Sequence, residues 1–161
     1  MARVSTSVKR RLERFKRKQD KIVHQPSYLG RPLLYHFDAS LRIVGIGQHH
    51  DTITHRTGLV PTNVHLKGQP RFGQRLWQED VWSLASPIEG DAPLEQHLEW
   101  LWNAIAPHID YFRELISEAS RADVVLGCFS ESPYPFLTVE TASLRLLREM
   151  DVGISFNFTC V

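Results

Sequence analysis

The densest group of side chains that could bind a metal ion comprises His49, His50, Asp51 and His55. Zinc accepts imidazole nitrogen and carboxylate oxygen, and a catalytic zinc site needs three such ligands and an open position. The spacing is poor for that role. Two ligands on one helix face should be four residues apart, whereas His50 and His55 are five apart. We therefore favour surface histidines, and a metal-dependent hydrolase using His49, His50 and Asp51 is our third hypothesis.

Other catalytic patterns are missing from the sequence. It contains neither of the common phosphate-binding glycine motifs, and Ser130-Glu131-Ser132 lacks the glycines of a nucleophile elbow. Cys128 and Cys160 each lie in an alternating apolar run, and a disulfide is conceivable only if those runs are neighbouring strands. We predict reduced thiols in a cytoplasmic protein. The sequence supports no enzyme class, so we expect a protein that is not an enzyme and has no cofactor.

The net charge of +1 hides a strong asymmetry along the chain. Residues 1–21 hold nine of the 19 lysines and arginines but two of the 18 acids, a net charge of +7. The remaining 140 residues hold ten basic and 16 acidic side chains, a net charge of −6. Such a cationic segment can release counterions from a nucleic-acid backbone. The candidate nucleic-acid-binding residues are Lys9, Arg10, Arg11, Arg14, Lys16, Arg17, Lys18 and Lys21.

The same segment has a second interpretation. Val8, Leu12 and Phe15 recur at helical spacing, so residues 6–21 could form a short amphipathic helix with cationic flanks. Opposite net charges would draw this segment towards the acidic body. We favour a solvated or folded-back segment over nucleic-acid binding, because the body has no basic stripe to continue the contact.

Trp77 is the best candidate for an aromatic anchor that binds a partner, because it lies in a polar loop between Arg75 and Gln78. Aromatic anchors dominate interface energies where binding buries them. Trp82, Trp100 and Trp102 lie in or beside apolar patterns, so at least two of them should belong to the core. The predicted partner-binding residues are Lys67, Arg71, Arg75 and Trp77.

Hydrophobic periodicity predicts a sheet with helices between its strands. Every second residue from Leu33 to Ile43 is apolar, which predicts a strand with one wet face. Apolar residues at helical spacing from Leu94 to Ala119 predict a long helix capped by Asp91, with a break near Ala106 because Pro107 lies inside it. The other predicted elements are a helix at 51–57 closed by Gly58, an extended piece at 61–73, strands at 81–88, 124–128 and 154–160, and a helix from Thr138 to Met150 that ends before Gly153.

This pattern has the order β-α-β-β-α-β-α-β after a basic N-terminal helix. An α+β fold satisfies it best, with a mostly antiparallel sheet and the helices packed on one face. We divide the chain into a basic extension and linker at 1–32 and a single domain at 33–161. No apolar stretch approaches the ~20 residues that span a bilayer, and no apolar segment of a secretion signal follows the basic residues. The sequence leaves the oligomeric state open.

Several short stretches occur together in a recognisable order. They are Leu41-Arg-Ile-Val-Gly, the helix from Asp51 to Leu59, Pro61-Thr62, Lys67-Gly68, Trp82-Ser-Leu84, Leu94-Glu-Gln-His-Leu98, and a closing helix and strand. In this order and spacing, over Leu33 to Val161, the chain resembles a bacterial family known only as a domain of unknown function, number 4279.

The resemblance implies an α+β domain of bacterial or phage source, and it implies no reaction. Residues 1–32 lie outside it. The last strand reads Phe156-Asn-Phe-Thr-Cys160, where similar sequences lead us to expect an aspartate and a tyrosine. Lys67 precedes a turn glycine, a position that favours exposure and contact with a partner or an anion.

Our leading hypothesis is a small non-catalytic module that binds another protein, of the toxin-neutralising (immunity) or host-interaction kind. The missing catalytic motifs and the split charge motivate it, because an acidic body suits a basic partner such as a nuclease toxin. The alternative is a nucleic-acid-binding protein that uses the basic N-terminal segment.

Overall fold

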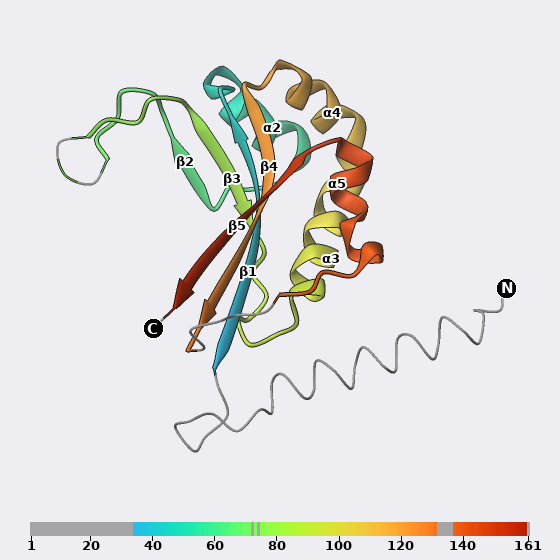
Figure 1. Ribbon diagram of the computed structural model, residues 1–161. Coiled ribbons are helices and arrows are strands. Elements are labelled where there is room, and N and C mark those ends of the chain that lie inside the picture. Colours follow the sequence, from blue (N-terminus) through green and yellow to red (C-terminus); the bar gives the residue numbers. More distant parts are fainter. Residues whose placement is uncertain (1–33, 72, 74, 132–136, 161) are drawn as a thin grey trace, which may run out of the picture.

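A five-stranded sheet forms the centre of the molecule (Figure 1). The computed structural model describes residues 34–71, 73, 75–131 and 137–160. The strands lie in the order β2-β3-β1-β4-β5, and only β4 and β5 are parallel neighbours. Their bounds are β1 Tyr35–Val44, β2 Asn63–His65, β3 Val81–Ala85, β4 Arg121–Ser130 and β5 Gly153–Cys160.

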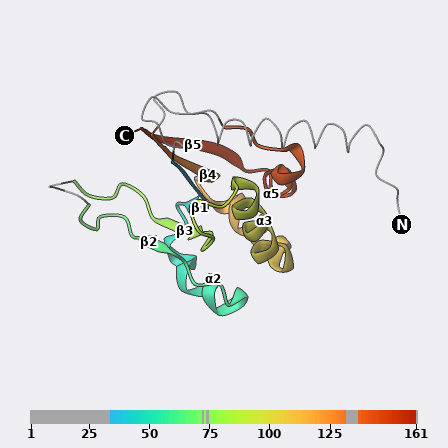
Figure 2. The ribbon, with the colours of Figure 1, turned by 90° about the horizontal axis from the view of Figure 1, so that it is seen from below.

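The helices α3, α4 and α5 cover one face of this sheet (Figures 1 and 2). The other helix, α2, lies at the end of the sheet where β1 finishes (Figure 1). Among the described residues, none of these helices is long and apolar enough to cross a membrane. The bounds are α2 His50–Thr57, α3 Leu94–Ile105, α4 Ile109–Glu118 and α5 Arg145–Met150, with short 3-10 turns at Gly47–His49, Ala106–His108 and Thr141–Leu144.

Apolar and polar residues alternate along β1, so that one face of the strand is buried and the other is exposed, as predicted. Ala39, Leu41 and Ile43 are fully buried against the helices, whereas His36 and Asp38 on the opposite face are exposed. The core between sheet and helices includes Trp82 and Phe112, whose ring centroids lie 5.9 Å apart. Trp82 is fully buried, as predicted, and Trp100 and Trp102 pack against the core while remaining partly exposed.

The α+β class and the mostly antiparallel sheet are confirmed. The predicted break at Pro107 is also present, because the 3-10 turn Ala106–His108 separates α3 from α4. The predicted long helix is therefore two helices. Gly58 ends α2 in the left-handed region, with φ of 72°, as its position after Thr57 indicated.

Two predicted helix caps are wrong. Asp91 does not cap α3, which begins at Leu94 after Pro93. Thr138 does not cap α5 either, because a 3-10 turn at Thr141–Leu144 precedes that helix. The helix ends at Met150 as predicted, and its C-cap is Asp151, whose φ of 50° lies in the left-handed region, while Gly153 already belongs to β5. Aspartate tolerates this conformation better than most residues, which explains how the chain turns without glycine there.

Both cysteines are free thiols, one buried (Cys128) and one exposed (Cys160). Although β4 and β5 are neighbouring strands, Cys128 is in register with Phe158 and Cys160 with Ser130. The predicted basic N-terminal helix and the linker lie outside the described residues.

Candidate partner-binding arm

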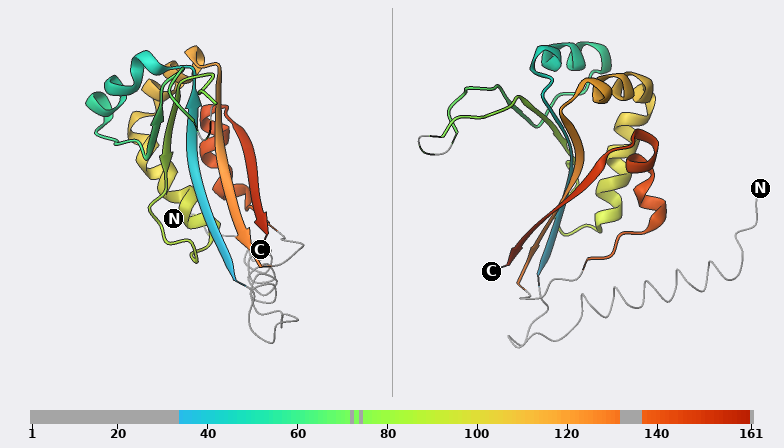
Figure 3. Two further views of the ribbon diagram at one scale, coloured as in Figure 1. Left: turned by 90° about the vertical axis from the view of Figure 1, so that its left-hand side faces the viewer. Right: turned by 45° about the horizontal axis from the view of Figure 1, so that its top comes forward.

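Residues 65–71, 73 and 75–80, from the end of β2 to the start of β3, form an arm that extends away from the body of the molecule (Figure 1; Figure 3, right). Its two legs continue β2 and β3 beyond the sheet and stay connected by backbone hydrogen bonds. Gly68 N–H donates to the Trp77 carbonyl at 2.8 Å, and Arg71 N–H donates to the Arg75 carbonyl at 2.7 Å. Because the legs are bonded to each other, the arm is an ordered projection rather than a loose loop.

All four predicted partner-binding residues, Lys67, Arg71, Arg75 and Trp77, lie on this arm. Trp77 is not the freely exposed anchor that its polar neighbours suggested, because its indole contacts two side chains of the arm itself. The His65 ring stacks on it at 4.1 Å with an interplanar angle of 12°, and the Arg71 guanidinium lies 4.5 Å from its centroid. Since His65 occupies one face of the indole, Arg71 covers the other. The stack stiffens the arm and leaves the indole half-buried.

The outer part of the arm is cationic. Lys67, Arg71 and Arg75 are exposed, and within the described ranges none of them forms an ion pair with an acid. Leu66 and Leu76 lie beside them and are 41% and 51% exposed. Apolar side chains flanked by unpaired cations are typical of a surface that a partner buries. Sequence reasoning missed the two leucines, because neither belongs to an amphipathic pattern.

The acidic side chains of the arm lie at its base and contact the body. Asp80 accepts a hydrogen bond from the Lys67 backbone N–H at 2.8 Å through Oδ1, and its carbonyl accepts one from Gly45 N–H at 2.9 Å. A Cβ added at Gly47 would overlap the Asp80 carboxylate. Asp80 therefore joins the two legs of the arm through its carboxylate and joins the arm to the body through its carbonyl, and the carboxylate leaves no room for a side chain at position 47.

The histidine cluster does not come together as a metal site. His49 Nε2 lies 3.1 Å from Glu118 Oε2, and Asp51 and His55 are exposed on α2. His50 is buried, and burial lowers its pKa. The nearby charges of Asp80 and Asp51 act in the opposite direction but do not cancel this effect. Over the described part of the chain, no group of three histidine, cysteine or acidic residues is placed to hold a metal ion.

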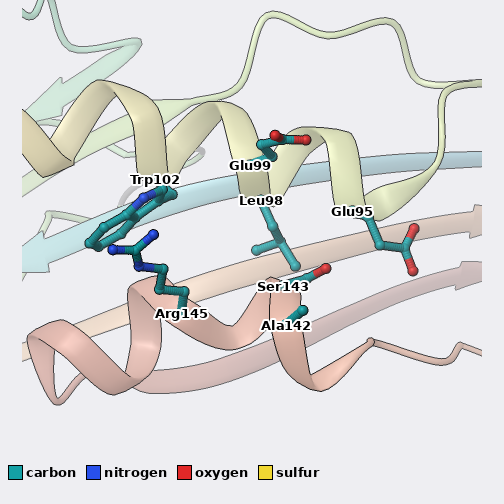
Figure 4. Close-up of a pocket in the computed structure, with 7 residues that line it drawn as sticks. All are labelled: Glu95, Leu98, Glu99, Trp102, Ala142, Ser143 and Arg145. Atoms are coloured by element: carbon teal, nitrogen blue, oxygen red, sulfur yellow. The ribbon is translucent and has the colours of Figure 1, made fainter. Parts of the chain in front are cut away.

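A shallow pocket lies between α3 and the segment that enters α5 (Figure 4), with a volume of about 320 Å³. Sequence reasoning did not identify it. Within it, the Arg145 guanidinium lies 4.2 Å from the Trp102 ring centroid. The two carboxylates that line the pocket, those of Glu95 and Glu99, lie four residues apart on α3. The lining residues are Glu95, Leu98, Glu99, Trp102, Ala142, Ser143 and Arg145.

A partly buried ion pair crosses the sheet on the face opposite α3, α4 and α5. Arg42 on β1 donates from Nε and Nη2 to the Asp123 carboxylate on β4, at 2.8 and 2.6 Å. Ser155 on β5 donates to the same carboxylate. Asp123 is 4% exposed, and although burial raises its pKa, the hydrogen bonds from Arg42 and Ser155 outweigh burial and hold the pKa below its usual value. The network joins three strands and serves the fold.

The candidate nucleic-acid-binding residues at positions 9–21 lie outside the described residues. Among the described residues, the arm therefore carries all of the predicted binding residues.

Comparison with known proteins identifies the family. Residues 34–160 match the family described as a domain of unknown function (DUF4279), and the chain belongs to it. No curated protein and no solved structure matches the chain.

Proposed function

We propose that this member of the DUF4279 family is a non-catalytic module that binds another protein through its arm. The observation that supports this most directly is the outer arm itself, where three cations without an acidic partner in the described chain flank exposed Leu66 and Leu76. The bound surface of the partner would be acidic at its rim and apolar at its centre, because the proposed contact is with the cationic arm and not with the acidic body.

The stack around Trp77 favours a protein over a nucleic acid as the ligand of the arm. Single-stranded nucleic acids bind on aromatic faces that are free to stack with bases. His65 and Arg71 cover the indole, so the arm offers charge and apolar contact but no open aromatic platform. Its rigidity lowers the entropy lost on binding.

A photo-crosslinking residue tests the proposal. Placed at Leu76 of the full chain in its native host, it should capture one protein at physiological salt, whereas the same residue at the exposed Glu99 on α3 should not. Arg75→Glu should weaken that complex about tenfold or more, because it reverses a charge at the contact without touching the Trp77 stack. The matched control is Arg148→Glu on α5, an exposed cation that forms an ion pair with Glu149 and should leave binding unchanged.

Capture of no protein, or capture that is equally strong from Leu76 and Glu99, would refute the proposal. Equal weakening by Arg75→Glu and Arg148→Glu would show that only net charge matters, which also contradicts a specific arm contact.

The biological setting that we propose for such a module is neutralisation of a toxin. The captured protein should then stop growth when it is expressed alone, and co-expression of this chain should restore growth. Arg75→Glu should restore growth less well than Arg148→Glu. A captured protein that is harmless alone would contradict the toxin-neutralising role while leaving the arm contact intact, and a host-interaction role would follow.

A further inference from the structure

Strand β5 presents an apolar surface that the helices of the described chain leave uncovered. Ile154, Phe156 and Phe158 are 37%, 50% and 47% exposed, and the two phenylalanine rings stack with centroids 6.1 Å apart. We call these three residues the β5 apolar surface. Their register partners on β4 are fully or almost fully buried in the core: Val124, Leu126 and Cys128.

The β5 apolar surface continues the core side of the sheet. Residues paired across neighbouring strands project from the same face, so Phe156 and Phe158 lie on the face that α3, α4 and α5 cover. The helical layer ends before it reaches this last strand (Figure 2). The strand Gly153–Cys160 also contains no charged residue and no proline. Edge strands are usually guarded by such residues, which points to a further element that covers β5.

Residues 6–21 have the composition that this surface needs. Their apolar residues Val8, Leu12 and Phe15 recur at helical spacing and would form one apolar stripe. Residues 1–21 carry a net charge of +7, whereas the rest of the chain carries −6. An apolar stripe with cationic flanks is thus attracted to the acidic body, and the β5 apolar surface can bury the stripe.

The start of β1, where the N-terminal segment joins the domain, also lies close to the end of β5. Tyr35, the first residue of β1, pairs with Ser130, and Ser130 pairs with Cys160 at the end of β5. Adjacent strands lie about 4.8 Å apart, so this entry point is roughly 10 Å from the far end of β5. The residues between 22 and 33 can span about 35 Å when extended, which is more than enough to bring the segment back over β5.

We propose that residues 6–21 of the chain pack as an amphipathic helix on the β5 apolar surface of the same molecule. Val8, Leu12 and Phe15 contact Ile154, Phe156 and Phe158, and the lysines and arginines face solvent and the acidic body. The segment then completes the helical layer of the domain. This assigns the basic extension to an intramolecular contact that is separate from the arm.

Cys160 is a native reporter for this contact. It lies on the same face of β5 as Phe158, two residues further along the strand, and it is exposed in the described part of the chain. In the full chain the packed segment should slow its reaction with iodoacetamide. The double variant Leu12→Asp/Phe15→Asp should react at Cys160 about tenfold faster, because two charges in the stripe prevent packing on an apolar surface.

The control variant is Thr6→Asp/Ser7→Asp, which makes the same charge change outside the stripe and should leave the Cys160 rate unchanged. Cys128 reports on the fold, because burial keeps it unreactive as long as the sheet is intact. A Cys160 rate that is equal in the full chain and both variants, with Cys128 protected, would overturn the proposal. So would protection that disappears on dilution, since it would place the segment on another molecule.

Discussion

Arg42 and Asp123 are 81 residues apart in the chain and form a two-point ion pair across the central strands of the sheet. Asp123 is 4% exposed, whereas the Arg42 side chain keeps 31% of its surface. Asp123 also accepts a hydrogen bond from Ser155. This carboxylate is therefore the point at which β1, β4 and β5 are joined by side chains.

Replacing Asp123 by asparagine should destabilise the fold. The amide keeps the size of the side chain, but it removes the charge that two Arg42 nitrogens contact and leaves the guanidinium with a poorer acceptor. Hydrogen bonds to charged groups contribute about 1.5–3 kcal/mol, so we expect the free energy of unfolding to fall by about 2–3 kcal/mol. Urea denaturation measures this change. Asp91→Asn, at an exposed position, is the control and should change it by less than about 0.5 kcal/mol.

The same carboxylate should make the protein sensitive to acid. The pKa of Asp123 is lower in the folded chain than its usual value of 3.8. Its contribution to stability is present above about pH 3.8 and is lost as the pH falls through the lower folded pKa. Denaturation curves collected from pH 6 to pH 2 should show the wild type and Asp123→Asn converging at the acid end. A difference that stays constant over this range would contradict the assignment.

Two buried histidines should weaken the fold at mildly acidic pH. Burial lowers the pKa of both His50 and His97 from 6.5. The unfolded chain then binds protons that the folded chain excludes, so the free energy of unfolding is highest above pH 6.5 and declines as the pH falls below it. His50→Gln and His97→Gln should each reduce this decline between pH 7.5 and pH 5. The exposed His55→Gln should not change it, and thermal melting across this range compares the three.

Gly47→Ala should loosen the arm without unfolding the domain. The new methyl group would displace the Asp80 carboxylate, which accepts a hydrogen bond from the Lys67 backbone N–H. Hydrogen exchange at the Lys67 amide should therefore become at least about tenfold faster, since a protected amide exchanges only when its hydrogen bond opens. The Phe37 amide, bonded to the Gly90 carbonyl within the body, is the internal control. Unchanged exchange at Lys67 would mean that Asp80 does not fix the arm.

Much of the fold could be predicted because its signals are local. The alternation through Leu41 and Ile43 predicted the buried face of β1. A proline inside a helical pattern kinks or breaks the helix, so Pro107 predicted the break between α3 and α4. The left-handed cap of α5 could not be predicted, since Asp151 adopts there a conformation that is most common for glycine. Long-range pairs such as Arg42 with Asp123 leave no local trace.

The candidate site shows the same division. Lys67, Arg71, Arg75 and Trp77 were identified from their types and polar surroundings, and the structure places them on one arm. The covering of Trp77 by His65 and Arg71 could not be foreseen, because it depends on how the legs of the arm are paired. The pocket beside Trp102 depends on the approach of Arg145 from another element, and spacing along the chain does not reveal such an approach.

The position of β1 has a consequence for how the protein is made. This strand leaves the ribosome before β4, which is its longest partner and whose Ala122 pairs with Ile43. At about 5–20 residues per second, translation takes roughly 4–16 s to reach β4 after β1 has been synthesised. During that interval the apolar side of β1 has only part of its final cover. A nascent chain paused before residue 121 should therefore recruit chaperones, and release of the pause should end that recruitment.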